Sequence, residues 1–457
     1  MASPDLVERG WGRAALRSVM ASAVVVACSQ STPTTPPDAD APREGGGDES
    51  VEVITDGGAM TDDGAMTDDG AMTDGGVTVD VVAADGGAAP SQEDAGLDVG
   101  DAKGEEPPLA YAWDLPRGFP VPSVPDNNPM SAAKVELGRH LFYDVRLSHN
   151  QSQSCATCHR QELAFTDGRP HAVGSTGIEH PRSAMSLANV AYASTLTWAN
   201  PLQLDLEHQA LIPMFGDDPI ELGLPTADEL VQRLSSDALY SALFPDAWPG
   251  ETEPVTIEHV VQALASFERT MISGNSPFDR WQYSGDKTAL SPEAMRGYQV
   301  FNDEDVGCTH CHVGFALTDH VHWNGKAFFE KPYHNTGLYN IDGKGAYPEP
   351  NTGVYHVTGH PEDMGRFKAP TLRNVAVTAP YMHDGSIATL DEVLDHYQAG
   401  GRTIASGPKA GIGSLSPLKD SVIRPFTLSV EDRAALIAFL NSLTDETFLN
   451  DARLGPP

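Results

Sequence analysis

The chain has 457 residues, which is enough for two or three domains. Its formal net charge of −35 argues against nucleic acid or an anionic membrane surface as a binding partner. About half of the acidic excess lies in residues 31–110, where twenty acidic side chains face only two bases, Arg43 and Lys103.

The N-terminus predicts export. Arg9, Arg13 and Arg17 form a basic region, and the apolar run over residues 18–27 ends in small residues before Cys28. This pattern is typical of a bacterial lipoprotein signal, in which Cys28 becomes the lipidated first residue. An ordinary cleaved signal with a stray cysteine is the alternative. We expect a signal peptide over residues 1–28 and a protein on the periplasmic side, held to a membrane only by its lipid anchor.

Residues 29–110 predict a disordered tether. Asp, Gly, Thr and Pro are abundant, and three near-copies of Ala-Met-Thr-Asp-Asp-Gly run from Ala59 to Gly76. Calcium-binding loops are an alternative, but the repeats lack the alternating apolar residue of such loops. Because so little apolar material cannot offset the entropy of ordering the segment, we expect a solvated spacer.

From Tyr111 onward the hydrophobic periodicity predicts a mainly α-helical fold, since strand-like alternation is scarce. The clearest helical period runs over residues 256–273. Capping boxes are expected at Thr226 with Glu229 and at Thr389 with Glu392. Helix starts are expected at Ser131, Thr226, Thr256, Ser291, Thr389 and Ser429.

Two pentapeptides carry the chemistry, Cys155-Ala-Thr-Cys-His159 and Cys308-Thr-His-Cys-His312. Each has the C-x-x-C-H form of c-type haem attachment, in which two cysteines bind the porphyrin and the histidine ligates its iron. One zinc site built from both cysteine pairs is the alternative, but it leaves both histidines without a role. The residues expected to hold two covalent haem c groups are Cys155, Cys158, His159, Cys308, Cys311 and His312.

An internal repeat accompanies the two motifs. The segment 184–191, AMSLANVA, is similar to the segment 369–376, APTLRNVA, and each lies downstream of its own haem motif. Nine residues after the repeated asparagine comes Trp198 in the first copy and His383 in the second. We therefore predict two related cytochrome c-like haem domains, over residues 111–274 and 275–457.

Over about residues 111–449 the chain resembles the bacterial di-haem cytochrome c peroxidase and MauG superfamily. Residues 196–202 and 214–222 are in addition similar to its MbnH-type branch, whose members oxidise a tryptophan of a copper-binding partner to kynurenine. The stretches that carry the wider resemblance are FTDG (165–168), FERT (267–270), HNTGL (334–338), KAPTLRNV (368–375) and TAPYMHDG (378–385).

The resemblance implies that Tyr397 is the sixth ligand of the second haem iron, where family peroxidases have Met and MauG has Tyr. Tyr397 shares a helix face with Leu390, Val393 and Leu394, so its spacing alone favours a core tyrosine. A Met ligand raises the reduction potential of a haem, whereas an anionic phenolate should stabilise the oxidised iron.

The first haem is expected to keep an open face for hydrogen peroxide. Family peroxidases close that face with a histidine after a Thr-Gly pair, but here Ile178 follows Thr176-Gly177. His171 and His180 lie nearby, either as substitutes or, more simply, as surface histidines.

Other site residues are implied only by the resemblance. Glu221 is expected to act as general acid/base toward peroxide, with a solvated loop carboxylate as the alternative. Met214 as an iron ligand would instead close the open site. The carried-over distal-pocket residues are Gln209, Pro213 and Glu221.

Between the two haems the resemblance places a tryptophan and a calcium ion. Trp198 matches the tryptophan that couples the haems, with a buried core tryptophan as the alternative. The calcium ion would be bound partly by the carbonyls of Thr378 and Pro380, and Ser183 replaces the asparagine ligand of the family.

The resemblance implies an oxidoreductase that uses hydrogen peroxide to form a high-valent two-iron state and then oxidises a partner protein side chain, a tryptophan. The first alternative is a cytochrome c peroxidase that reduces peroxide to water with electrons from a small redox protein. The second is a non-enzymatic electron-transfer cytochrome. Tyr397 and Ile178 favour the partner-oxidising enzyme over the peroxidase, and Glu221 argues against the electron carrier.

Overall fold

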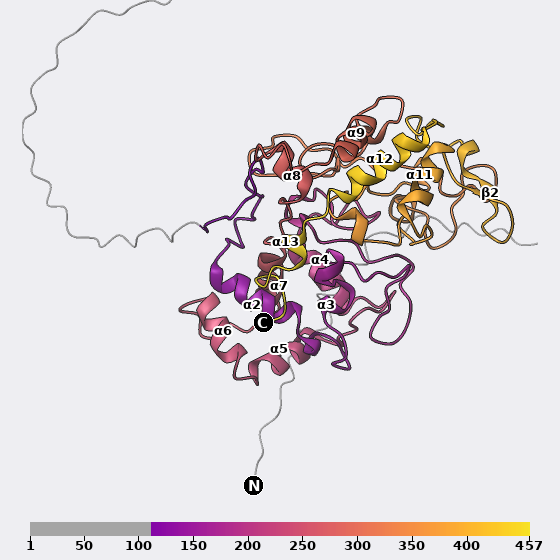
Figure 1. The fold of residues 1–457 in the computed structure, drawn as a ribbon. Helices are drawn as coiled ribbons and strands as arrows, with labels where there is room; N and C mark the ends of the chain where they lie inside the picture. The colour runs from indigo at the N-terminus through magenta and orange to yellow at the C-terminus, as the bar shows by residue number, and fades with distance from the viewer. Residues whose placement is uncertain (1–110) are drawn as a thin grey trace, which may run out of the picture. The chain divides into compact units, whose positions relative to one another are not determined.

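The computed structural model describes residues 111–457 (Figure 1). The signal peptide with Cys28 and the tether over residues 29–110 lie outside the described residues and stay predictions. The α-helices are α2 (Ala132–Phe142), α3 (Cys155–Cys158), α4 (Leu206–Phe215), α5 (Ala227–Ser235), α6 (Tyr240–Ala247), α7 (Ile257–Glu268), α8 (Pro277–Gln282), α9 (Pro292–Phe301), α10 (Tyr355–Thr358), α11 (Leu390–Gln398), α12 (Val430–Asn441) and α13 (Glu446–Leu449).

Little strand accompanies these helices. The short strands β1 (Thr403–Ile404) and β2 (Gly411–Ile412) pair antiparallel, with Thr403 opposite Ile412. Within residues 111–457, no helix is both long and apolar enough to cross a membrane. The mainly helical fold that the periodicity predicts is confirmed.

Local capping determines where the long helices begin. At α11, Thr389 and Glu392 form the expected reciprocal capping box. At α5 the predicted box is wrong, because the Glu229 carboxylate binds Arg233 instead of returning to the cap. All six predicted N-caps accept a backbone N–H with their side chains: Ser131, Thr226, Thr256, Ser291, Thr389 and Ser429.

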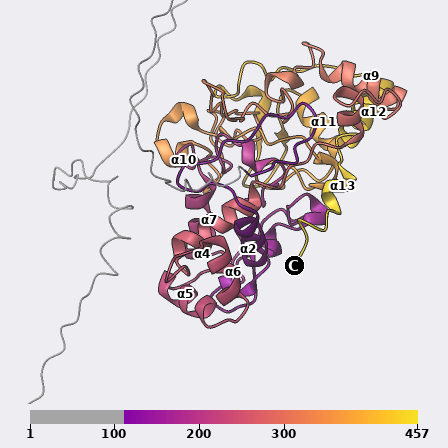
Figure 2. The ribbon, with the colours of Figure 1, turned by 90° about the vertical axis from the view of Figure 1, so that its left-hand side faces the viewer.

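The first half is built on a close crossing of α2 and α7. A Cβ atom on Gly138 would lie 1.9 Å from the carbonyl oxygen of Ala263, so a glycine is required at the crossing. Leu137 and Phe267 are fully buried beside it, and α5 and α6 lie around the same pair of helices (Figure 2). The helix α7 ends at Glu268, five residues before the predicted end at Ser273.

The second half has a matching crossing of α9 and α12. A Cβ atom on Gly297 would lie 1.9 Å from the carbonyl oxygen of Ala435. Phe301 and Phe439 are buried there, with their ring centroids 5.0 Å apart. Each half therefore has its own core, organised by one helix pair.

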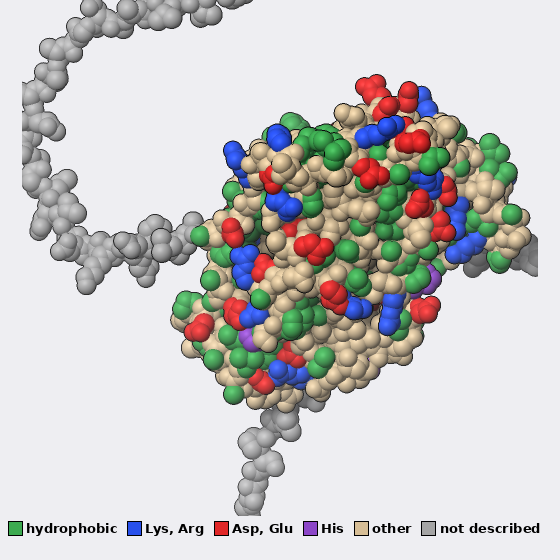
Figure 3. Space-filling view, viewed as in Figure 1, with side chains coloured by type: hydrophobic (Ala, Val, Ile, Leu, Met, Phe, Trp, Pro, Cys, Tyr) green, Lys and Arg blue, Asp and Glu red, His purple; other side chains and the backbone are tan. Residues whose placement is uncertain are grey.

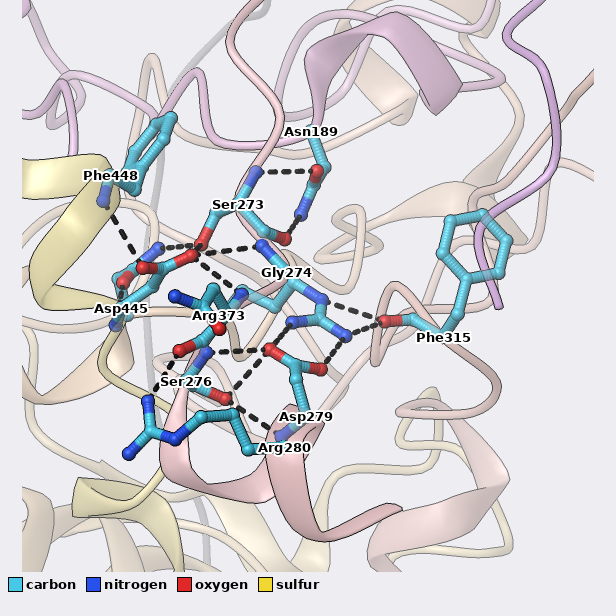
Figure 4. Close-up of polar contacts among 12 residues, drawn as sticks. Asn189, Ser273, Gly274, Ser276, Asp279, Arg280, Phe315, Arg373, Asp445 and Phe448 are labelled. Carbon is cyan, nitrogen blue, oxygen red and sulfur yellow. Dashed lines mark hydrogen bonds and ion pairs between the residues drawn. The ribbon is translucent and has the colours of Figure 1, made fainter. Parts of the chain in front are cut away.

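Buried polar side chains join these cores through residues 273–275. Asn189 brackets the backbone of Ser273, accepting from its N–H at 3.0 Å and donating to its carbonyl at 2.9 Å (Figure 4). The Asp445 carboxylate accepts from Gly274 N at 2.9 Å and from Asn275 N at 2.8 Å. After Asp445 the chain returns to the first core, where Phe448 is buried. The predicted boundary at residues 274/275 stays a prediction, since the last residues pack across it.

Candidate haem sites

The first motif presents a histidine that is prepared for a metal. Cys155 and Cys158 lie on α3, which begins with a capping box between Ser154 and Thr157. His159 follows, and its Nδ1 lies 2.8 Å from the carbonyl oxygen of Phe165, which has φ +61°. Nε2 is left for the iron, and burial lowers the pKa of His159, which favours the neutral ring that metal ligation needs.

The second motif has the same arrangement. His312 Nδ1 lies 3.1 Å from the carbonyl oxygen of Leu317, which has φ +50°. Burial also lowers the pKa of His312. The two proximal histidines are thus oriented alike, each by a carbonyl in a positive-φ turn shortly after the motif.

A single zinc site is excluded by the geometry of residues 111–457. There, the one group of at least three His, Cys or acidic side chains with all ligand atoms within 4.8 Å is Cys311, Asp319 and His334. The two cysteine pairs therefore do not meet. His334 is no free ligand either, because Asp319 binds its Nε2 at 2.7 Å and Asp420 binds its Nδ1 at 2.9 Å.

These contacts place a cation beside the second motif. Burial alone would lower the pKa of His334, but its hydrogen bonds with Asp319 and Asp420 raise that pKa to about 12. This charge was not predictable from the sequence, because Asp420 lies 86 positions from His334 along the chain.

A largely apolar cavity adjoins the second motif and fits a porphyrin. It is lined by Cys308, Cys311 and His312 of the second motif and by Leu394 and Tyr397 of α11. No described residue hydrogen-bonds the Tyr397 hydroxyl, although burial raises the pKa of that group. A hydroxyl in this position would find its partner in a bound iron, which also favours the phenolate form.

Trp198 lies between this cavity and a second one that spans the two halves. Its indole Nε1 donates to the carbonyl oxygen of Ser183 at 2.9 Å, and its own carbonyl accepts from Lys368 N at 2.8 Å. The first contact holds the indole ring in place. The role of Trp198 in coupling the two haems stays a prediction, because Cys155, Cys158 and His159 do not line the second cavity.

The predicted calcium ligands line the cavity that spans the halves. Thr378 and Pro380 are on its wall, and the Ser183 hydroxyl there donates to the carbonyl oxygens of Met382 and His383. Among the described residues, no acidic side chain lines this cavity. The site offers calcium neutral oxygens, and the ion stays a prediction.

The predicted distal residues lie around the end of α4. Gln209 and Pro213 are one turn apart on this helix, and Leu222 N donates to the Pro213 carbonyl at 2.8 Å, which brings Glu221 to the same place. Burial raises the pKa of Glu221 to about 7, so this carboxyl can both take and return a proton near neutral pH. Met214 belongs to the first hydrophobic core.

His180 was not assigned a role beside Glu221, yet its Nε2 lies 3.7 Å from Glu221 Oε1. The two residues are 41 positions apart, so the contact is not apparent in the sequence. Ile178, at the expected ligand position of the loop, is 53 % exposed.

Comparisons with known proteins agree with this geometry. The family model for di-haem cytochrome c peroxidase matches residues 132–288. Methylamine utilization protein MauG of Methylorubrum extorquens is 34% identical over 333 residues, covering 72% of this chain and 83% of the relative. Cytochrome-c peroxidase IdrP1 of Denitromonas iodatirespirans is 35% identical over 374 residues, covering 78% of this chain and 91% of the relative.

Solved structures show the same relationship. The crystal structure of a MauG-like protein associated with microbial copper homeostasis is 48% identical, covers 76% of this chain and 99% of its own, and has a TM-score of 0.74. The diheme peroxidase BthA from Burkholderia thailandensis shares the fold at 20% identity. The match has a TM-score of 0.55 and covers 72% of this chain and 91% of BthA. The chain therefore belongs to the di-haem cytochrome c peroxidase and MauG family, and it is an oxidoreductase whose two C-x-x-C-H motifs fit two haem c groups.

Proposed function

We propose that this enzyme uses hydrogen peroxide to oxidise a tryptophan side chain of a partner protein. The observation that carries the proposal is Tyr397, whose unpartnered hydroxyl faces the cavity lined by Cys308, Cys311 and His312. A phenolate ligand favours an oxidised iron and so favours storage of oxidising equivalents over rapid reduction by a small donor. The 34% identical MauG and the 48% identical MauG-like protein support the same reaction class.

The haem groups, when bound, supply iron that peroxide can oxidise. The protein supplies the orientation and the proton transfer. His159 and His312 would each hold an iron through Nε2. Glu221 would take a proton from peroxide and return it to the departing oxygen, and Trp198 lines both cavities.

We also propose that the halves are two related haem domains. Support comes from contacts that recur at equivalent positions. Ser186 Oγ donates to the Ala164 carbonyl at 2.6 Å, and Thr371 Oγ1 donates to the Ala316 carbonyl at 2.6 Å. Further pairs are the glycine crossings Gly138 and Gly297, the proximal ligands His159 and His312, and the positive-φ residues Asn189 and Asn374.

The partner is proposed to be an exported protein, and copper handling is the first context in which to search because of the related MauG-like structure. A lipid anchor at Cys28 would hold this chain on the periplasmic side, where it would meet an exported partner. A neighbouring-operon protein whose intact mass rises only after treatment with this enzyme and peroxide would identify the substrate.

One experiment separates this function from that of a peroxidase. One equivalent of hydrogen peroxide is added to the fully oxidised di-haem protein, and the visible spectrum is followed. We expect a persistent oxidised state to form without prior reduction of either haem. A protein that ignores peroxide until one haem is reduced would instead be a cytochrome c peroxidase, the activity named for IdrP1. A protein unreactive in both redox states would be an electron carrier.

A further inference from the structure

Residues 172–182 form a hairpin that contains both Ile178 and His180. Val173 pairs antiparallel with Glu179, Gly174 N donates to the Ile178 carbonyl at 2.9 Å, and His180 N donates to the Ala172 carbonyl at 2.7 Å. Ile178 is 53 % exposed, whereas the His180 side chain is 26 % exposed.

The hairpin is fixed to the segment that carries Glu221. Ser175 N donates to the Glu221 carbonyl at 2.7 Å, and Ser175 Oγ donates to the Leu222 carbonyl at 3.0 Å. A Cβ atom on Gly174 would lie only 1.9 Å from the Ile220 carbonyl oxygen. The distance between His180 and Glu221 is therefore set by backbone contacts rather than by a mobile loop.

The tautomer of His180 follows from its other contact. The backbone N–H of Arg182 donates to His180 Nδ1 at 3.1 Å, so Nδ1 is an acceptor and carries no proton. In the neutral ring the proton then lies on Nε2, the atom 3.7 Å from Glu221 Oε1. Hydrogen bonds between catalytic groups are commonly long before substrate enters and shorten in the complex.

We propose that His180 is a positioning residue for Glu221: its Nε2–H donates to the Glu221 carboxylate and orients it for proton transfer at the first haem. This inference rests on the proposed function, because it assumes that the first haem is open. It assigns His180 to the carboxylate and not to the iron. His180 then serves the peroxide site without closing it.

The charged neighbours leave the His180 ring neutral. Burial, followed by the charges of Arg182 and His171, lowers the pKa of His180 to about 4. His171 lies at the start of the same hairpin, 3.6 Å from Glu179. Cys155 and Cys158 are the other titratable groups that interact with Glu221, and their sulfurs carry no charge once they are in thioether bonds.

The test uses cyanide binding to the oxidised holoenzyme, which needs no turnover. Hydrogen cyanide loses a proton as its anion binds ferric haem, so the association rate should rise with pH as Glu221 becomes a base; burial raises the pKa of this carboxyl above its usual range. A hydrogen-bond donor lowers the pKa of a carboxylate. His180→Ala should therefore move the midpoint of this profile upward by about one pH unit.

His180→Gln, which retains a donor, should lie closer to the unmodified protein than His180→Ala does. His171→Gln is the matched control on the same hairpin and should leave the profile unchanged. The proposal is overturned if the His180→Ala profile matches that of the unmodified protein, or if the Gln variant is shifted as far as the Ala variant. Failure of the unmodified protein to bind cyanide would instead overturn the open first haem and, with it, the proposed function.

Discussion

His159 and His312 have the same surroundings at residue scale: each is buried, and each has Nδ1 against the carbonyl of a residue with positive φ. We propose that the main difference between the two irons lies on the opposite face of each haem. The proposed residue there is the ionisable carboxyl Glu221 at the first haem and the hydroxyl of Tyr397 at the second. We attribute the division of labour between the haems to these two side chains.

Replacing Tyr397 tests its proposed role as a ligand of the second haem iron. A thioether favours reduced iron more than a phenolate does, so Tyr397→Met should raise the reduction potential of the second haem, within the range of about 0.8 V over which axial ligands act. Spectroelectrochemical titration measures the potential of each haem separately. Tyr397→Phe, which removes the oxygen but keeps the ring, is the control for packing. An unchanged potential in both variants would make Tyr397 a core residue.

Among elements, those that depend on local chemistry were predictable from sequence. A Ser or Thr side chain that caps a helix interacts within three residues, and the structure has such a cap at each of the six expected helix starts. The box at Glu229 is wrong because Arg233, one turn later, competes for its carboxylate. The hairpin that brings His180 to Glu221 depends on backbone contacts between distant segments, which periodicity does not report.

The crossing of α9 and α12 gives a prediction about stability. Gly297→Ala would push a methyl group against the Ala435 carbonyl, so the helices must separate, at a cost of about 1–3 kcal/mol in the free energy of unfolding. Chemical denaturation of the holoenzyme, followed by circular dichroism, measures this loss. Gln299→Ala, on the exposed side of α9, is the matched control and should have little effect. Equal stability of the two variants would contradict the close crossing.

On the scale of the whole molecule, one buried polar centre links the halves and another lies within the second half, and neither was predicted. Asp445 binds residues 273–275 before the chain returns to the first core, and Arg373 forms a two-point ion pair with Asp279 at 2.7 and 2.8 Å (Figure 4). The C-x-x-C-H motifs predicted the haem cysteines and histidines, and family likeness implied Tyr397 and Trp198, but these long-range pairs depend on the assembled fold. Elsewhere, Lys, Arg, Asp and Glu are interspersed over the visible face (Figure 3).

The buried pair should matter far more than a surface pair. Asp279→Asn leaves Arg373 as a fully buried, unpaired cation and should cost about 3–5 kcal/mol of stability. Arg296→Gln breaks the pair with Asp432, in which the Arg296 side chain is 54% exposed, and should change stability little. Thermal unfolding of both variant holoenzymes measures their losses of stability. Equal losses in Asp279→Asn and Arg296→Gln would show that the Arg373 pair does not stabilise the fold.

The unequal coordination of the two irons is measured most directly by resonance Raman spectroscopy of the oxidised holoenzyme, whose marker bands report the coordination number of each haem. We predict one five-coordinate haem and one six-coordinate haem, with the six-coordinate bands lost in Tyr397→Phe. Six-coordinate bands from both haems, or bands that Tyr397→Phe leaves unchanged, would contradict the account.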